Sequence, residues 1–254
     1  MLRTRVIPCL LLRGEGLVKT VKFKNPTYLG DPINIVKIFN DKEVDELVLL
    51  DTLATRDGRR PAFELLGRIT TECFMPLSYG GGVRRIDDMR ELFAIGIEKV
   101  VVNSYAAECP AFVQEAAELF GSSSVVVSID VRRSLLGRYE VVTHGGTRRT
   151  GLEPVVFAQE MERRGAGELL VTSVDRDGTM AGYDLALIRR VSDAVGVPVV
   201  ACGGAGSVSD LAAAVADGGA SAVAAGSMFV FQGRHRAVLV NTPGEAELRA
   251  AFGP

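Results

Sequence analysis

Short apolar runs alternate with segments of helical periodicity along most of the chain. The runs are apolar at nearly every position instead of every second one, which is typical of parallel strands buried on both faces. The intervening segments carry apolar residues three and four positions apart, as amphipathic helices do. The predicted strands are Val6–Leu12, Leu47–Leu50, Pro76–Ser78, Val100–Val102, Val125–Ile129, Leu169–Thr172, Val197–Ala201 and Ala222–Ala225. The predicted helices include Ile33–Phe39, Ile86–Ala94, Phe112–Phe120 and Leu185–Val195.

The number of strand and helix pairs indicates the fold. Eight such pairs in 254 residues predict an α/β fold of the (β/α)8 barrel type. Glycines stand where the helices should end, at Gly96, Gly121, Gly165 and Gly196. The alternative is an open, doubly wound sheet. An open sheet needs an edge strand, and no run is polar enough to be one, so we favour the barrel.

The chain also contains an internal repeat. The stretch PLSYGGGVRRIDD at 76–88 aligns with PVVACGGAGSVSD at 198–210, an offset of 122 residues. Glu46 and Glu168 show the same offset, each followed by leucine. Self-similarity at one long period indicates a duplicated structural unit. We therefore predict one domain over 1–254, built from half-barrels of about 1–122 and 123–254 that share a core.

Composition and charge argue against two classes of partner, nucleic acids and membranes. The chain has 29 Lys and Arg against 31 Asp and Glu, a net charge of −2, which argues against a nucleic-acid partner. No apolar run approaches the ~20 residues of a membrane span. The first residues, MLRTRVIPCLLLRGEG, lack an export signal. We therefore expect a cytoplasmic protein with no membrane partner.

Cysteine and histidine spacing argues against metal chemistry. The cysteines are Cys9, Cys73, Cys109 and Cys202, and no two form a CxxC pair. His144 and His235 are isolated and belong to no HExxH motif. We expect no metal site and no cofactor, and we interpret the cysteines as reduced thiols.

The repeated glycines predict a ligand site. Gly80–Gly82 follows the third strand, and Gly203, Gly204 and Gly206 follow the seventh. Glycine lets backbone N–H groups approach an anion closely. The next strands end in Asn103-Ser104 and in Gly226-Ser227. Two phosphate sites on opposite sides of one barrel mouth would suit a ligand that is anionic at both ends. The alternative is that these glycines only form tight turns.

A set of motifs resembles the cyclase subunit of imidazole glycerol phosphate synthase over nearly the whole chain. The motifs are RVIPCL at 5–10, GDPI at 30–33, DELVLLD at 45–51, GGGVR at 80–84, KVVVNS at 99–104, VVVSID at 125–130, GAGELLVTSVDRDGT at 165–179 and ACGGAGS at 201–207. The resemblance implies a barrel that receives ammonia from a separate glutaminase subunit at its N-terminal face. The ammonia crosses the lumen and meets a bisphosphorylated ribulosyl aminoimidazole at the C-terminal face.

Two catalytic aspartates are implied by the same resemblance, at the ends of strands 1 and 5. Asp130 matches the second position. At the first position the family pattern reads Cys-Leu-Asp-Val, whereas this chain reads Cys9-Leu10-Leu11-Leu12. Leucine cannot exchange a proton, and a positioned acid or base contributes ~10²–10⁴-fold to a rate. Leu11 therefore argues against an efficient cyclase, and the sequence alone predicts neither the presence nor the absence of enzyme activity of the synthase type.

The resemblance also implies an ammonia gate at the N-terminal end of the barrel. Its four charged positions all match, at Arg5, Glu46, Lys99 and Glu168. Two cations and two anions can form a ring in which each buried charge has a partner. The alternative is a purely structural cluster that closes the barrel floor.

The implied phosphate and substrate positions match in part. One phosphate site would contain Gly82, Asn103 and Ser104, and the other Gly178, Gly204, Gly226 and Ser227. Lys19 matches a functional loop lysine and Asp177 a substrate-binding acid. The alternatives are a solvated lysine and an aspartate that only shapes an Asp-Gly turn. Tyr79 stands where the family has a smaller residue, and it fills space either in the lumen or at the mouth.

Leu11 and the wording of the first loop resemble a divergent branch of the family, associated with bacterial surface polysaccharides. This branch supplies ammonia to an ATP-dependent sugar amidotransferase, which converts an acetamido group on a nucleotide-linked sugar into an acetamidino group. We favour this function. The alternatives are a working cyclase of histidine biosynthesis, a non-catalytic activator of a glutaminase, and a phosphosugar isomerase. Gene context would separate the first two.

Overall fold

The computed structural model of the chain describes residues 4–134, 136–233 and 235–253. Eight parallel strands form a closed barrel, because each pairs with the next and the last pairs with the first. In order they are β1 (Arg5–Arg13), β4 (Leu47–Asp51), β5 (Leu77–Gly80), β6 (Lys99–Val102), β7 (Val125–Arg133), β10 (Glu168–Ser173), β11 (Val199–Cys202) and β12 (Ala222–Ala225). Every predicted strand overlaps one of these, so the predicted (β/α)8 barrel is confirmed.

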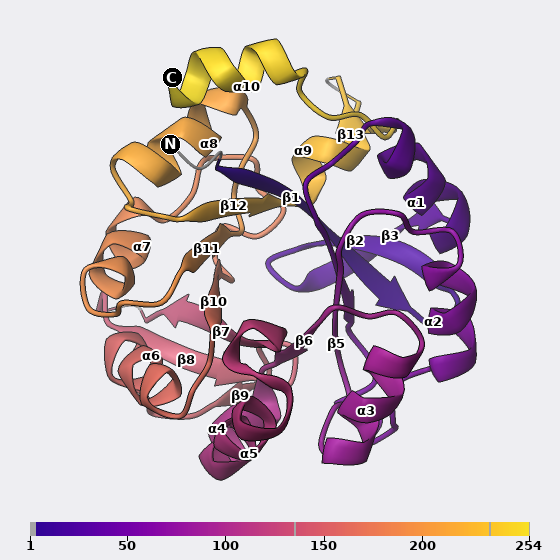
Figure 1. Ribbon diagram of the computed structural model, residues 1–254. Helices are drawn as coiled ribbons and strands as arrows, with labels where there is room; N and C mark the ends of the chain where they lie inside the picture. Colours follow the sequence, from indigo (N-terminus) through magenta and orange to yellow (C-terminus); the bar gives the residue numbers. More distant parts are fainter. Residues whose placement is uncertain (1–3, 135, 234, 254) are drawn as a thin grey trace.

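Helices surround the barrel on its outer side (Figure 1). They are α1 (Pro32–Asp41), α2 (Phe63–Thr70), α3 (Ile86–Ala94), α4 (Ser104–Glu108), α5 (Pro110–Phe120), α6 (Pro154–Arg163), α7 (Leu185–Ser192), α8 (Val208–Ala216), α9 (Ser227–Val230) and α10 (Glu245–Phe252). The sequence explains where several of these helices begin. The Asp31 side chain accepts the Asn34 N–H at 2.9 Å, for example, and Pro32 occupies the first turn of α1. The seventh helix ends at Ser192, three residues earlier than predicted.

Two hairpins extend the barrel at its mouth. β2 (Gly16–Val21) and β3 (Lys24–Gly30) follow β1, and β8 (Tyr139–Thr143) and β9 (Arg148–Arg149) follow β7. The segment after the first strand was expected to be a loop. It forms strands because Leu17 and Val18 are buried and join the ladder of β1.

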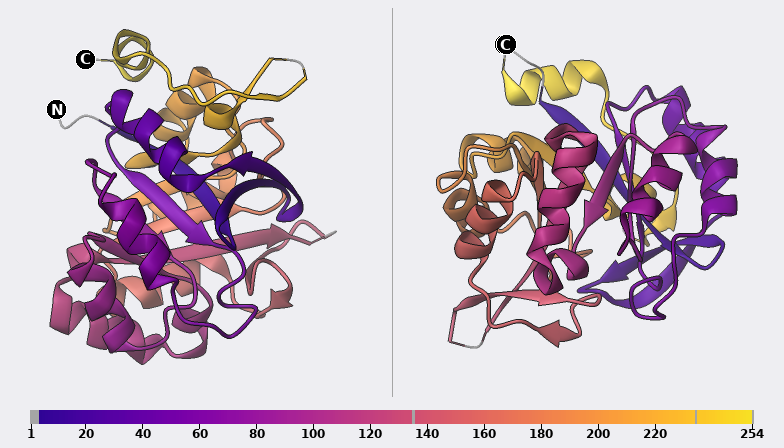
Figure 2. Two further views of the ribbon diagram at one scale, coloured as in Figure 1. Left: turned by 90° about the vertical axis from the view of Figure 1, so that its right-hand side faces the viewer. Right: turned by 60° about the horizontal axis from the view of Figure 1, so that its bottom comes forward.

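The remaining elements lie outside this plan. A 3-10 turn, η1 (Ser122–Ser124), joins the two half-barrels, and β13 (Phe231–Gln232) pairs with β14 (Ala237–Val238). Helix α10 packs beside α8 (Figure 1), and Figure 2 shows α10, in yellow, at the C-terminal end of the chain. Within the described residues, none of the helices has the length and apolarity that a membrane crossing requires.

Apolar side chains pack in two layers, one on each side of the barrel wall. The outer layer lies between the strands and the helices and includes Phe39, Leu49 and Tyr79. Tyr79 therefore fills space outside the barrel wall, so both places predicted for it, the lumen and the mouth, are wrong. The inner layer lines the lumen and consists of Ile7, Cys9, Val48, Val101, Val126, Leu170, Val200, Ala222 and Ala224.

Candidate functional site

A cavity of about 470 Å³ opens at the carboxyl ends of the barrel strands. We call it the mouth. All of the predicted catalytic, phosphate and substrate positions line it: Leu11, Lys19, Gly82, Asn103, Ser104, Asp130, Asp177, Gly178, Gly204, Gly226 and Ser227. These residues come from loops and strand ends throughout the chain. The strand order gathers them because parallel strands in a barrel all end at one face.

Strand register places Leu11 and Asp130 at equivalent positions of the two half-barrels. Leu11 lies opposite Leu50 on the neighbouring strand, and Asp130 lies opposite Thr172. Leu50 and Thr172 are 122 residues apart, the period of the repeat. Leu11 is buried and Asp130 is half-buried. The chain therefore presents one carboxyl group where the twofold plan has room for two.

Asp130 has the environment of a group that exchanges protons near neutral pH. Burial raises its pKa to about 7, and the negative charge of Asp177 acts in the same direction. The Ser128 hydroxyl donates a hydrogen bond to Asp130 Oδ1 at 3.3 Å, which partly opposes the rise in pKa. A carboxyl group with a pKa near the working pH is suited to general acid or base catalysis.

Lys19 and Asp177 form a buried ion pair at the mouth. Lys19 Nζ lies 2.7 Å from Asp177 Oδ1, and both residues are less than a tenth exposed. Burial opposes the charge on Lys19, but the neighbouring Asp177 carboxylate raises the lysine pKa overall. Lys19 is therefore not a solvated loop lysine. Asp177 also accepts a hydrogen bond from the Thr20 hydroxyl at 2.9 Å, so it anchors the β2–β3 hairpin.

Gly178 also helps to anchor the β2–β3 hairpin. Its φ is +71°, and a Cβ at this position would lie 2.1 Å from the Thr20 carbonyl oxygen. Only glycine permits this approach of two backbones. The Lys22 N–H also donates to the Asp177 carbonyl oxygen at 2.9 Å. The hairpin of the first half-barrel is thus held over the mouth by the loop after β10.

The first predicted phosphate site is satisfied by bonds within the protein. The Gly82 N–H donates to Thr55 Oγ1 at 3.2 Å, and the Asn103 amide donates to the Ser128 carbonyl oxygen at 2.9 Å. The Ser104 hydroxyl accepts the His144 N–H at 2.9 Å and donates to Asn103 Oδ1 at 3.1 Å.

The second predicted phosphate site is different. The Ser227 hydroxyl is buried, with its residue 4% exposed, and has no hydrogen-bond partner among the described residues. Buried polar groups in native proteins nearly always have a partner, so such an atom needs an explanation. A Cβ at the adjacent Gly226 would lie 3.0 Å from Lys19 Cε, so the absence of a side chain here brings the lysine next to this site.

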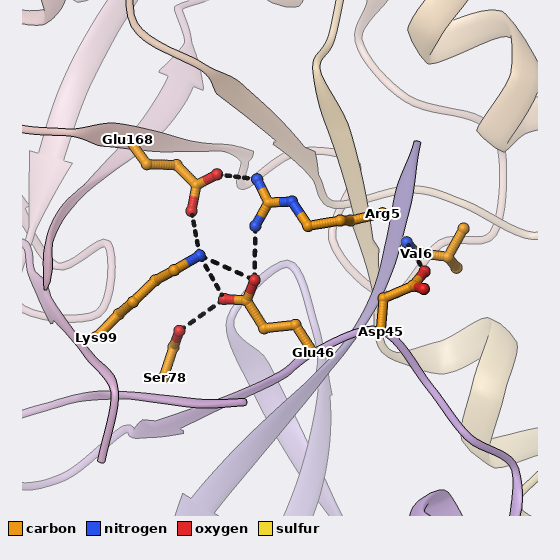
Figure 3. A network of polar contacts seen from close by, with 7 residues as sticks. All are labelled: Arg5, Val6, Asp45, Glu46, Ser78, Lys99 and Glu168. Atoms are coloured by element: carbon orange, nitrogen blue, oxygen red, sulfur yellow. Dashed lines mark hydrogen bonds and ion pairs between the residues drawn. The ribbon is translucent and has the colours of Figure 1, made fainter. Parts of the chain in front are cut away.

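At the opposite end of the barrel, four charged side chains meet in a ring (Figure 3). Arg5 pairs with both Glu46 and Glu168, and Lys99 also pairs with both. The Lys99 Nζ lies 2.9 Å from Glu46 Oε2 and 3.1 Å from Glu168 Oε2. The Ser78 hydroxyl donates to Glu46 Oε1 at 2.8 Å. We call these four charged residues the floor ring.

Within the floor ring, Glu46 is buried and yet its pKa lies below the usual value. Burial alone would raise the pKa of Glu46, but bonds from Lys99 and Ser78 and the charge of Arg5 lower it overall. Arg5 is half-buried, and the two carboxylates raise its pKa against the effect of burial. The ring therefore closes the amino end of the lumen with paired charges, and the inner apolar layer lies directly above it.

Comparison with known proteins identifies the family. A family model described as histidine biosynthesis protein matches residues 5–236. The chain belongs to this family. It is 50% identical over 243 residues to a Pseudomonas aeruginosa protein provisionally named imidazole glycerol phosphate synthase subunit hisF2, covering 96% of this chain and 97% of that protein. A Leptospira interrogans protein provisionally named subunit HisF of the same synthase is 46% identical over 253 residues, covering 99% and 100%. A Vibrio vulnificus relative provisionally named subunit hisF3 is 44% identical over 253 residues, covering 99% and 97%.

Some features of this HisF-like chain were missed by sequence reasoning. Cys9 and Cys202 both line the mouth, although the two residues are far apart in sequence, and the neighbouring Cys202 and burial both raise the pKa of the Cys9 thiol. The bonds that fill the first phosphate site come from Thr55 and His144, which belong to loops with no recognisable motif. Among the described residues, no group of three or more His, Cys, Asp or Glu side chains is placed to hold a metal ion.

Proposed function

We propose that this chain is the barrel subunit of a glutamine amidotransferase complex that delivers ammonia for the amidination of a nucleotide-linked sugar in surface polysaccharide biosynthesis. In that reaction the nitrogen of ammonia replaces the carbonyl oxygen of an acetamido group, and that oxygen leaves bonded to the phosphorus that ATP supplies. An ATP-dependent sugar amidotransferase partner would activate that oxygen for departure. The barrel itself would supply the route for ammonia.

One observation carries the proposal: the floor ring is complete while one of the two mouth carboxylates is replaced by Leu11. The aliphatic lumen above the floor ring suits the passage of neutral ammonia, because apolar walls do not favour ammonium.

The glutaminase subunit would dock at the floor of the barrel. Phe74 is 83% exposed in the loop that leads into β5, at the same end as the floor ring. Ile38 and Leu119 are also exposed, in the second halves of α1 and α5, which run back toward this end. Exposed apolar side chains around a channel entrance suit a partner protein.

A docking experiment tests this surface. Phe74→Asp should weaken binding of the glutaminase subunit at least 10-fold by calorimetry, because it places a charge in the contact. Val156 is the matched control, since it is also exposed but lies in the first turn of α6, at the mouth end. Equal effects of Phe74→Asp and Val156→Asp would contradict docking at the floor.

A working cyclase is the second candidate, favoured by Asp130, whose pKa of about 7 suits proton transfer. The deciding assay gives the purified chain the bisphosphorylated ribulosyl aminoimidazole with excess ammonium salt at alkaline pH, which bypasses the glutaminase. We expect no turnover. Turnover of ~1–10³ s⁻¹ would establish the cyclase and overturn the amidination proposal.

A further inference from the structure

Two cysteines come together at the end of the lumen that opens into the mouth. Cys9 belongs to the inner apolar layer, and Cys202 packs against that layer from β11. Strand register explains their proximity, because Ala224 of β12 pairs with both Ile7 of β1 and Cys202. Cys9 follows Ile7 by two positions, so both point to the lumen face of β1. Both cysteines line the mouth, and the ammonia route described above assigns a role to neither.

The barrel wall keeps the two thiols from forming a disulfide. β12 lies between β1 and β11, and two strand spacings amount to roughly 9–10 Å. A disulfide needs Cα atoms within about 6.8 Å of each other. The pair therefore consists of two free thiols that act separately as nucleophiles.

The surroundings of Cys202 favour its thiolate, which is the reactive form of a cysteine. The neighbouring Cys9 thiol lowers the pKa of Cys202, against the effect of burial. The Lys19 ammonium lowers this pKa further, and Asp177, the ion-pair partner of Lys19, acts in the opposite direction. The pKa of Cys202 is lowered overall, whereas the pKa of Cys9 is raised well above its usual value. Cys202 is thus the thiol of the pair that ionises first.

Backbone packing holds Lys19 beside the two thiols. A Cβ at Gly226 would lie 2.9 Å from the Cys9 carbonyl oxygen and 3.0 Å from Lys19 Cε. The missing side chain therefore leaves the space in which the lysine lies along β1. Because Lys19 is buried and bonded to Asp177, its charge keeps a fixed place at the mouth.

Two hydroxyl groups complete the surroundings of Cys202. Thr172 is its strand partner on β10, and the Thr172 hydroxyl favours the thiolate. The Tyr183 hydroxyl donates to the Ala224 carbonyl oxygen at 2.9 Å, and burial raises the pKa of this tyrosine well above its usual value, so it is uncharged. The charges that act on Cys202 are therefore those of the buried ion pair.

We propose that Cys202 is a nucleophilic site at the exit of the lumen, activated by Lys19, which small soft electrophiles such as peroxides modify. In the reaction with a peroxide, the thiolate sulfur attacks one peroxide oxygen, the O–O bond breaks and hydroxide or alkoxide leaves. The sulfur is oxidised to a sulfenic acid, and the peroxide is reduced. Because the barrel wall excludes a disulfide with Cys9, that thiol does not consume the sulfenic acid. The inference does not depend on where ammonia comes from or goes.

Alkylation of the wild-type chain tests the site. Iodoacetamide forms a C–S bond with a thiolate and loses iodide, and mass spectrometry of peptides follows each cysteine separately. Cys109 is the matched control, because it is half-buried like Cys202 but stands between α4 and α5, outside the lining of the mouth. At pH 7 we expect Cys202 to react at least 10-fold faster than Cys109. The ratio should shrink as the pH rises, because an ordinary thiol ionises near pH ~8.5. Peroxide followed by dimedone should label Cys202 and leave Cys109 unlabelled.

Two variants of the ion pair test the activation, with opposite expected signs. Lys19→Met removes the positive charge and should slow the alkylation of Cys202 at least 10-fold at pH 7. Asp177→Asn removes the negative charge and should speed it at least threefold. A mouth that was only loosened by mutation would give faster alkylation in both variants.

Three outcomes would overturn the inference. In the wild-type chain they are a Cys109 that reacts as fast as Cys202, and a Cys202 that stays unmodified. In the variants it is a change of the same sign, which would exclude activation by Lys19. The comparison of cysteines within the wild-type chain requires no variant, so a variant that fails to fold does not affect it.

Discussion

The two ends of this barrel use the internal repeat in opposite ways. At the floor, charges from both half-barrels close into one ring, with Glu46 and Glu168 in equivalent places and each bonded to both Arg5 and Lys99. At the mouth, equivalent positions of the repeat differ. Leu11 and Asp130 occupy equivalent positions on their strands, and only Asp130 carries a carboxyl group. The Ser104 hydroxyl has a hydrogen bond within the protein, whereas the Ser227 hydroxyl has none among the described residues. A ring of charges needs all its members, because any one left alone is a buried unpaired ion. A ligand site needs only the half that contacts the ligand.

This contrast explains why the floor retains its pattern while the mouth loses it. A substitution in the floor ring removes partners from two other residues at once. Leu11 leaves no polar group unpaired, because its side chain is aliphatic and buried, and its strand partners are Leu50 and Val18. Specialisation of the chemistry at the mouth therefore does not require a change at the floor.

The largest expected effect is a break in the floor ring. Glu46→Gln leaves Arg5 and Lys99 to share Glu168 alone and should lower the free energy of unfolding by about 3–5 kcal/mol at pH 7.5 in urea titrations. The pKa of Glu46 is lowered in the folded chain, so its stabilising effect is complete above pH ~4.5 and disappears as the pH falls through the folded-state value. The difference between variant and wild type should therefore shrink in acid.

Glu98→Gln is the matched control for the floor ring. Glu98 is exposed and precedes Lys99 at the same end of the barrel. It should cost less than about 0.5 kcal/mol. Equal costs for Glu46→Gln and Glu98→Gln would mean that the ring behaves as a surface cluster.

The second prediction concerns Asp130, the single carboxyl group at the twofold position. Its folded pKa of about 7 lies above the usual value of 3.8, so the folded chain binds an extra proton between these values and loses stability as the pH rises from 4 to 7. Asp130→Asn removes this loss. Its free energy of unfolding should exceed that of the wild type by about 2–4 kcal/mol at pH 8, with no gain at pH 4. The control is Asp41→Asn, which changes an exposed aspartate and should not raise the free energy of unfolding with pH in this way. If Asp130→Asn raised the free energy of unfolding equally at pH 4 and pH 8, the raised pKa of Asp130 would be refuted.

Apolar periodicity was enough to predict the eight strands, because strands covered on both faces have little freedom in composition. The four positions of the floor ring were also predicted, because the family resemblance implies them and each immediately precedes a predicted strand. The hydrogen bonds that distinguish the two halves of the mouth could not be predicted from the sequence. Lys19 reads as a solvated lysine until Asp177, 158 residues away, is placed beside it, and His144 reaches Ser104 through a hairpin tip with a left-handed backbone. Contacts between loops of distant segments leave no periodic signal.

The third prediction restores the missing acid. Leu11→Asp puts a carboxyl group at a buried position whose strand partners are Leu50 and Val18, and it should lower the free energy of unfolding by about 2–3 kcal/mol at pH 8, with a smaller loss at pH 5, where the buried acid takes up a proton. Leu11→Asn is the control, because it has similar size and no titration. Its cost should not vary with pH. We expect no cyclase turnover from either variant; turnover by Leu11→Asp would show that the mouth still holds the rest of a cyclase site.

The smallest expected effect lies behind the first phosphate site. Tyr79 is fully buried outside the barrel wall, and its hydroxyl donates to the Gly81 carbonyl oxygen at 3.1 Å, which ties down the turn that carries Gly82. The equivalent residue in the second half-barrel is Ala201, so the matching turn at Gly203 has no such bond.

Tyr79→Phe should lower the free energy of unfolding by about 1 kcal/mol, the worth of one hydrogen bond. Hydrogen exchange should speed up at residues 80–84 and stay unchanged at residues 202–206, whereas Tyr28→Phe, on an exposed ring, should alter neither. Faster exchange at both residues 80–84 and residues 202–206 would contradict this prediction. It would mean that the two turns are coupled and that the Tyr79 bond does not stabilise one of them alone.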